Sequence, residues 1–275
     1  VIQNGDLSSL GTVSSAEEPG HVVKDVDGVK IGMVCYSYGQ IGDNPDRPSM
    51  NDLPTDSAAA GLINAFDYNK LDLFYEEMTT QISDMRAKGA EAIVLYIHWG
   101  DEYSTSVNEK QKAIAQKMCD LGVDVIAGSH PHVVQEMALL TSTTDENHKT
   151  VCLYSMGNFL SNQRATNVGL TTGHTEDSLL FGFTFVKYSD GNVYLENVSV
   201  QPTWVLVRGS GNDRVYQILP LDYQGGDWGE NFDLSPSQED DAKASYNRTM
   251  ELVNPGLKTA QAYLEQSRIS RVGVG

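Results

Sequence analysis

The chain has 275 residues, 40% hydrophobic and 20% charged, which is enough to bury a substantial core in one or two domains. Its 37 acidic residues against 19 basic ones give a net charge of −18, which argues against binding to nucleic acid or to an anionic membrane surface. An anionic substrate is compatible with this charge, because a bound cation can dominate the local field.

Apolar runs in the first third of the chain predict a strand and then a helix. A buried strand is expected at 29–39, after a turn at Asp27-Gly28, and residues 40–66, rich in Gly, Pro, Asn and Asp, form a surface excursion. A helix that stops at Gly89 follows, because apolar residues recur there at helical spacing. These residues are Leu71, Phe74, Tyr75, Met78, Ile82 and Met85.

Three further apolar runs predict buried strands: "AEAIVLYIHWG" (90–100), "VDVIAG" (123–128) and "KTVCLYSMGNF" (149–159). Between the first two, Ser106 and Glu109 form a capping-box pattern that predicts the start of a helix. The three cysteines, Cys35, Cys119 and Cys152, lie far apart in apolar contexts, so we expect buried free thiols rather than a zinc site or a disulfide framework.

The segment 177–200 alternates apolar and polar residues about Asp190-Gly191, as expected of a β-hairpin. The whole order is strand, helix, strand, helix, strand, strand, hairpin, which predicts a layered α/β domain over residues 1–208. From residue 209 the composition becomes polar and rich in Gly and Asp. We therefore interpret residues 209–275 as a C-terminal appendage with a polar helical tail.

Polar side chains follow three of the predicted strands. They are His98, Asp101 and Glu102 after the first, His130 and His132 after the second, and Asn158 after the third. Because ligands bind at the carboxyl ends of strands in such folds, we expect these side chains to converge on one cleft.

The sequence also predicts how the two neighbouring histidines are oriented. Pro131 favours extended backbone before it, so the side chains of His130 and His132 are predicted to point to the same side. Imidazole is a common metal ligand, so the pair could share one metal ion or serve two adjacent ones. The alternative is a polar loop with two solvated histidines.

The motifs "HWGDEY", "LGVDVIAGSHPHVVQ" and "YSMGNFLSNQ", in this order and spacing, resemble the poly-γ-glutamate capsule-synthesis (CapA/PgsA-type) family of the calcineurin-like metallophosphoesterase superfamily. The segments "GTVSSAEEP" and "HVVKDVDGVKIGMVCYSYG" resemble those that precede the motifs, so the resemblance covers residues 11–187. It implies an α/β/β/α sandwich around a two-metal site, of which this chain carries the C-terminal portion.

The resemblance also implies ligands for that site. His98 matches the lone histidine of the fourth superfamily motif, and His130 and His132 match the final Gly-His-x-His motif, here with Ser129 inserted after Gly128. These three histidines are then expected to bind divalent metal ions such as Mn, Fe or Zn. Such a pair of ions polarises a phosphoryl or acyl oxygen and lowers the pKa of a bound water.

Three further residues are expected to take part in catalysis. Glu102 or Asp101 would fix the tautomer of a metal-binding imidazole, and Asn158 would donate a hydrogen bond to substrate or to metal-bound water.

The resemblance has one gap. The family's earlier motifs, an Asp-containing first strand, an Asp or Glu segment and an Asn-His segment, have no counterpart in this chain, which also begins without methionine. We expect them upstream of residue 1 and interpret the chain as a fragment of a larger protein. Three neutral histidines without a bridging carboxylate are expected to bind metal poorly.

Two functions follow from the resemblance. The first is a metal-dependent, phosphoesterase-like hydrolase in capsule or poly-γ-glutamate biosynthesis, anchored by an upstream segment at the extracellular face of the bacterial membrane or in the cell wall. Its expected partners are poly-γ-glutamate or another anionic polymer, or a phosphoester substrate, together with capsule-synthesis membrane proteins. The second is a non-catalytic surface protein that binds an anionic polymer or an assembly partner; metal content distinguishes the two.

Overall fold

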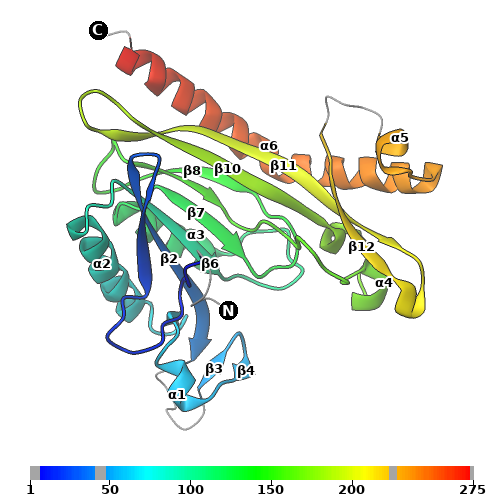
Figure 1. Cartoon of the computed structure of the whole chain (residues 1–275), viewed down its shortest axis with the longest axis horizontal. Helices are drawn as coiled ribbons and strands as arrows, with labels where there is room; N and C mark the ends of the chain where they lie inside the picture. Colours follow the sequence, from blue (N-terminus) through cyan, green and yellow to red (C-terminus); the bar gives the residue numbers. More distant parts are fainter. Residues whose placement is uncertain (1–6, 41–47, 223–227, 273–275) are drawn as a thin grey trace.

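The computed structural model describes residues 7–40, 48–222 and 228–272, and its larger sheet contains the predicted strands (Figure 1). Its strands are β1 (His21–Val26), β2 (Val29–Gln40), β3 (Ser49–Met50), β4 (Leu53–Pro54), β5 (Ala65–Phe66), β6 (Ala92–His98), β7 (Val125–Ser129), β8 (Met137–Thr141) and β9 (Lys149–Leu153). The order is β4-β3-β2-β6-β7-β9-β8, with β1 and β5 also paired with β2. Since β2, β6, β7 and β9 are parallel, their carboxyl ends lie at one edge.

Helices α2 (Leu71–Ala87) and α3 (Glu109–Asp120) pack on one face of this sheet. The predicted apolar stripe of α2 faces that core. Its four fully buried members are Phe74, Met78, Ile82 and Met85, and Leu71 and Tyr75 pack at the margin. From α3, Ile114 and Met118 join the same core. Burial of these apolar side chains is what holds the helices to the sheet.

The start of α3 differs from the prediction. Asn108, not Ser106, is the N-cap: its side chain accepts from the backbone N–H of Gln111 (2.8 Å), whose side chain accepts from the N–H of Asn108 (3.1 Å). The predicted partner Glu109 instead pairs with Lys112 at the exposed surface. Asparagine is as good an N-cap residue as serine. The sequence therefore contains two overlapping capping-box patterns, and the one that forms, Asn108 with Gln111, lies closer to the apolar residues of α3.

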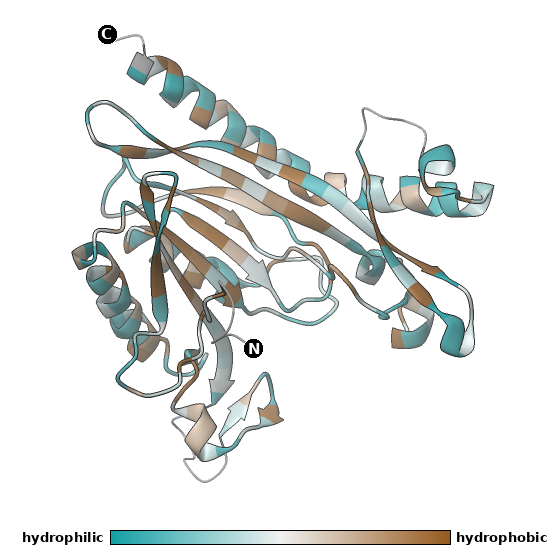
Figure 2. Cartoon of the chain, in the orientation of Figure 1, coloured by the Kyte–Doolittle hydropathy of each residue, from teal (hydrophilic) through white to brown (hydrophobic). Residues whose placement is uncertain are grey.

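The other face of the large sheet packs against a second, smaller sheet and the long C-terminal helix (Figure 1). This sheet has the order β10-β11-β12, with β10 (Asp177–Lys187), β11 (Val193–Arg208) and β12 (Val215–Pro220). The predicted hairpin is confirmed, since β10 and β11 pair antiparallel across the turn at Asp190-Gly191. Figure 2 shows hydrophobic stretches along both strands.

Helix α6 (Pro236–Val272) lies along β11 and beside the edge strand β8 (Figure 1). Its residues Val253, Leu257 and Leu264 share a core with Val151 and Leu153 of β9. The division at residue 208 stays a prediction, but β12 pairs with β11 and α6 contributes to this core, so residues on both sides of it pack together.

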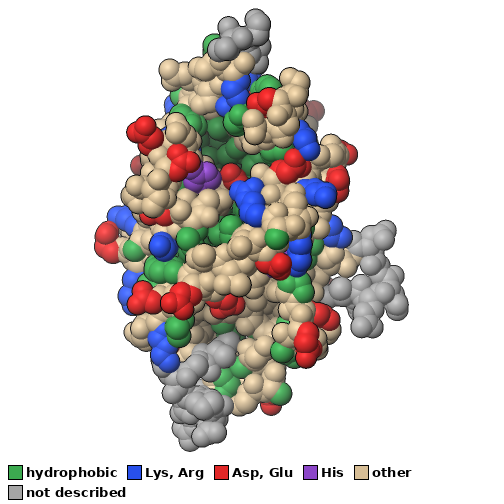
Figure 3. All heavy atoms as spheres, turned by 90° about the vertical axis from the view of Figure 1, so that its left-hand side faces the viewer, with side chains coloured by type: hydrophobic (Ala, Val, Ile, Leu, Met, Phe, Trp, Pro, Cys, Tyr) green, Lys and Arg blue, Asp and Glu red, His purple; other side chains and the backbone are tan. Residues whose placement is uncertain are grey.

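The remaining described elements are short. They are α1 (Ser57–Ala60), α4 (Ala165–Val168), α5 (Trp228–Phe232) and the 3-10 turns η2 (His174–Glu176) and η3 (Gly211–Asp213). Within the described ranges, no helix is both long and apolar enough to cross a membrane. On the face shown in Figure 3, basic side chains are scattered among acidic ones. The predicted α/β class is confirmed, with a large, mostly parallel central sheet.

Cys119 and Cys152 are buried free thiols and Cys35 is a partly buried one. Burial raises the pKa of all three thiols, so they remain protonated at neutral pH.

Candidate functional site

The three predicted histidines meet at the carboxyl ends of β6 and β7. His98 ends β6, in register with Ser129 at the end of β7, and His130 follows directly. The ring centroids of His98 and His130 lie 4.6 Å apart, and those of His130 and His132 lie 6.1 Å apart. The structure therefore brings these imidazoles together, as parallel neighbouring strands require; their role as metal ligands stays a prediction.

The backbone that carries the last two histidines is not extended, so that expectation is wrong. His130 has a φ of +104° and His132 a φ of +60°, values that residues other than glycine rarely adopt. The chain turns sharply here, and the N–H of Tyr103 donates to the carbonyl of Pro131 (2.8 Å). Backbone strain of this kind gathers at functional sites, where the surrounding structure holds it in place.

Gly128 allows this turn to sit close to the core. A Cβ at this position would lie 2.0 Å from the carbonyl oxygen of Tyr154 and 2.6 Å from Nε1 of Trp99. The Trp99 indole is fully buried and donates from Nε1 to that same carbonyl (2.8 Å). Glycine at the first position of the "GSHPH" motif therefore lets the end of β7 lie directly against Tyr154 and Trp99.

The tautomer of His132 follows from the hydrogen bonds of Asn158. The Asn158 Nδ2 has three acceptors within reach: the carbonyl of His132 (3.0 Å), Oε1 of Gln163 (3.0 Å) and the carbonyl of Thr175 (3.1 Å). Its Oδ1 must therefore accept, and His132 Nδ1 donates to it (2.9 Å). The tautomer of the neutral ring that fits these contacts carries its proton on Nδ1, and Nε2 lies 3.6 Å from Glu102 Oε1.

The His98 ring donates from its other nitrogen, Nε2. Its Nε2 donates to Asn51 Oδ1 (3.0 Å), and Ser129 Oγ lies 3.4 Å from its Nδ1. Burial, followed by the neighbouring charges of protonated His130 and His132, lowers the pKa of His98 to about 4. Burial also lowers the pKa of His130. Both imidazoles are therefore neutral at pH 7.

Asn51 was not predicted as a site residue. It lies in the two-residue turn between β3 and β4, where Asn51 and Asp52 both have positive φ, as hairpin turns of this length require. The turn reaches the histidines because β3 pairs with the end of β2. Asp52 accepts from the hydroxyl of Tyr38 (3.1 Å), whose ring stacks on His98. The Asn-Asp pair in the excursion 40–66 was the sequence signal for this turn; residues 41–47 of the excursion lie outside the described ranges.

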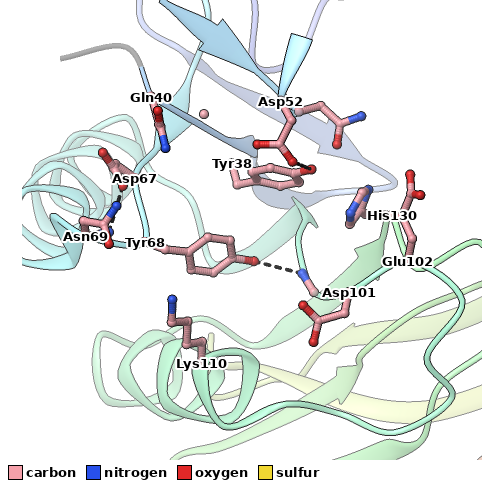
Figure 4. Close-up of a pocket in the computed structure, with 13 residues that line it drawn as sticks. Tyr38, Gln40, Asp52, Asp67, Tyr68, Asn69, Asp101, Glu102, Lys110 and His130 are labelled. Carbon is pink, nitrogen blue, oxygen red and sulfur yellow. Dashed lines mark hydrogen bonds between the residues drawn. The ribbon is translucent and has the colours of Figure 1, made fainter. Parts of the chain in front are cut away.

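A cavity of about 590 Å³ opens beside His130 (Figure 4). Four carboxylates line it, from Asp52, Asp67, Asp101 and Glu102, together with Tyr38, Tyr68 and Lys110. Figure 4 shows the Tyr68 hydroxyl directed at the backbone of the strand end, where it accepts from the N–H of Gly100 (2.9 Å). Burial raises the pKa of Tyr68 to about 12.

Of the predicted catalytic residues, Asp101 and Glu102 line this cavity and Asn158 does not. Glu102 is about half exposed and faces His132, which suits its predicted contact with an imidazole. Asp101 instead accepts from the side chain of Asn108 at the start of α3 (2.8 Å). Asn158 is instead hydrogen-bonded to His132. The catalytic roles of the three residues stay predictions.

Whether these side chains can hold a metal ion depends on their available donor atoms and on how those atoms are arranged. His130 is 7% exposed, and its Nδ1 is buried with no hydrogen-bond partner among the described residues; such an orphaned nitrogen is a chemically suitable donor. In the part of the chain that the structure describes, however, no group of three or more His, Cys, Asp or Glu side chains is arranged to hold a metal ion. The histidines therefore do not form a metal site by themselves in this arrangement.

Comparison with known proteins places the motifs in a family. The family model described as "Bacterial capsule synthesis protein PGA_cap" matches residues 1–163. The chain is 32% identical over 113 residues to the "PGA biosynthesis protein CapA" of Bacillus subtilis (strain 168), a match that covers 41% of this chain and 26% of that protein. It is 32% identical over 184 residues to the "Capsule biosynthesis protein CapA" of Bacillus anthracis, covering 64% of this chain and 39% of that protein.

The chain thus matches between about a quarter and two fifths of the length of these curated relatives. The family match includes all three strand-end motifs in full, with His98, His130, His132 and Asn158. The chain belongs to the bacterial capsule synthesis protein family PGA_cap.

Proposed function

We propose that this protein acts in the biosynthesis of a bacterial capsule of the poly-γ-glutamate type, at the outer face of the membrane or in the cell wall. The observation that carries the proposal is the meeting of three imidazoles at parallel strand ends in a member of this family. Capsule-synthesis membrane proteins are its proposed partners.

We further propose that the histidine site belongs to a metal-dependent hydrolase of the phosphoesterase type. Two imidazole nitrogens support this assignment: Nδ1 of His130, which has no hydrogen-bond partner among the described residues, and Nε2 of His132, which is left over when Nδ1 donates to Asn158. The cavity supports it in a second way. Its four carboxylates against one lysine would repel an anionic polymer or phosphoester, so such a substrate needs cations to bind there. Further donors are required, because the described side chains do not complete a metal site.

The second candidate is a non-catalytic protein that binds the polymer or an assembly partner. The histidines and carboxylates at this edge of the sheet supply groups that could bind a partner without any hydrolysis. Metal content and turnover separate the two candidates.

The test compares the 275-residue chain with a longer protein in which a segment that carries the earlier family motifs is joined upstream of residue 1, at equal concentration. Metal stoichiometry is measured by mass spectrometry and turnover by hydrolysis of 4-nitrophenyl phosphate. The hydrolase proposal predicts higher metal content and activity in the longer protein, and loss of both in His132→Ala. His148→Ala is the matched control: its imidazole donates to the carbonyl of Val123, at the opposite end of β7 from His130.

Two outcomes decide between the candidates. Metal-loaded longer protein without turnover, but with poly-γ-glutamate binding that His132→Ala weakens, favours the binding protein. Full turnover in the His132→Ala variant would refute both, because neither reading then has a role for this imidazole.

A further inference from the structure

The contacts that hold His132 continue into the C-terminal part of the chain, outside residues 1–163 of the family match. Asn158 donates from Nδ2 to the carbonyl of Thr175, which lies in the short turn η2. This carbonyl is one of the three acceptors that orient the Asn158 amide, and the orientation of the amide decides the tautomer of His132.

The turn η2 is held at both ends by one side chain of α6. Arg248 donates from Nε and Nη2 to the two carboxylate oxygens of Asp177 (2.8 and 2.7 Å), and Nη2 also lies within 3.4 Å of the carbonyl of Gly173. Gly173 precedes η2 and Asp177 follows it. The bidentate pair is charge-assisted, and its carboxylate is shielded from water because Asp177 is 1% exposed, whereas Arg248 is partly exposed.

A guanidinium suits this position and an ammonium does not. Arg248 reaches three oxygen atoms from one planar group, whereas a lysine offers a single charged nitrogen. A second pair, Arg164 with Glu176 (2.8 Å), holds the last residue of the same turn. Two ion pairs therefore hold this three-residue turn and the residue that follows it.

We propose that Arg248 is a positioning residue for His132. By clamping η2 it keeps the Thr175 carbonyl in place as an acceptor for Asn158 Nδ2, and so keeps Asn158 Oδ1 as the acceptor for His132 Nδ1. If the turn shifts, Nδ2 loses one of its three acceptors and is held by the carbonyl of His132 and by Gln163 alone, which weakens the preference for this amide orientation and for the tautomer with the proton on Nδ1. The importance of that tautomer rests on the proposed function of His132.

The inference is tested on the full chain at pH 8 by long-range ¹H–¹⁵N NMR of the histidine rings, which distinguishes Nδ1–H from Nε2–H. The variant is Arg248→Lys, which keeps the charge. The matched control is Arg268→Lys on the exposed part of the same helix, where Arg268 pairs with Glu265. We expect a smaller Nδ1–H fraction for His132 in Arg248→Lys than in the wild type and in Arg268→Lys, with His148 unchanged in all proteins.

A folded Arg248→Lys protein with a lower melting temperature and an unchanged His132 tautomer would show that the pair is only structural. If Arg248→Lys does not fold, the neutral pair Arg248→Gln with Asp177→Asn is measured instead. Failure of both to fold overturns the inference, since the pair then supports the whole fold. The readout is independent of activity: an active His132→Ala enzyme would refute the proposed function and leave the tautomer result standing.

Discussion

Acid should destabilise the protein through His98 in a way that one substitution can isolate. The pKa of this imidazole is 6.5 in the unfolded chain and about 4 in the folded protein, because burial disfavours the charged ring. Between these values the unfolded state binds the proton and the folded state does not. The stabilising contribution is therefore fully present above pH 6.5 and is lost as the pH falls through about 4.

The magnitude follows from the shift. Each pKa unit corresponds to about 1.4 kcal/mol, and pH 4.5 lies about two units below 6.5, which gives about 2.7 kcal/mol before any correction. His98 is only partly buried, so screening by solvent reduces the expected effect to roughly 2 kcal/mol.

The assay is urea unfolding of the wild-type protein and of His98→Asn at pH 7.5 and pH 4.5. The many carboxylates titrate in both proteins, so the variant removes their contribution from the comparison. The wild type should lose roughly 2 kcal/mol more than His98→Asn between the two pH values. Equal losses would show that His98 is not buried as a neutral ring, and the description of the site would then be wrong.

Two predictions concern packing. In thermal unfolding, Gly128→Ala should lower the stability by more than about 3 kcal/mol, because its Cβ would overlap the carbonyl of Tyr154. The control Gly61→Ala, with no atom within 4 Å and no positive φ, should be neutral or stabilising. A small loss of stability in Gly128→Ala would mean that the turn has room to move. Leu257→Ala, in the core between α6 and β9, should cost about 2–5 kcal/mol in urea unfolding, and a loss near zero would mean that α6 is not part of the folded unit.

The features that follow from local pattern could be predicted from the sequence. Uninterrupted apolar runs gave β6 and β7, helical spacing gave α2, and Asp190-Gly191 gave the hairpin. The proximity of His98 and His130 also follows from the sequence, because neighbouring parallel strands end at the same edge of a sheet.

The features that depend on contacts distant in sequence could not be predicted. The edge strand β8 is a short run whose place is set by pairing with β9, and the turn that carries Asn51 is set by pairing of β3 with β2. The backbone of His130 is strained against its local preference, which a rule based on Pro131 cannot anticipate. Arg248 reaches Asp177 over 71 residues, and no spacing pattern marks either as a pair.

The most direct test of the account is made in the bacterium that encodes the protein. Its chromosomal gene is altered to carry His130→Ala with His132→Ala, or His148→Ala as the control, and equal protein levels are verified by immunoblot. The measurement is the amount of capsular polymer on the cell surface. The account predicts that the double variant loses the capsule and that His148→Ala keeps it. A full capsule on cells that carry the double variant would contradict the claim that these histidines form the functional centre.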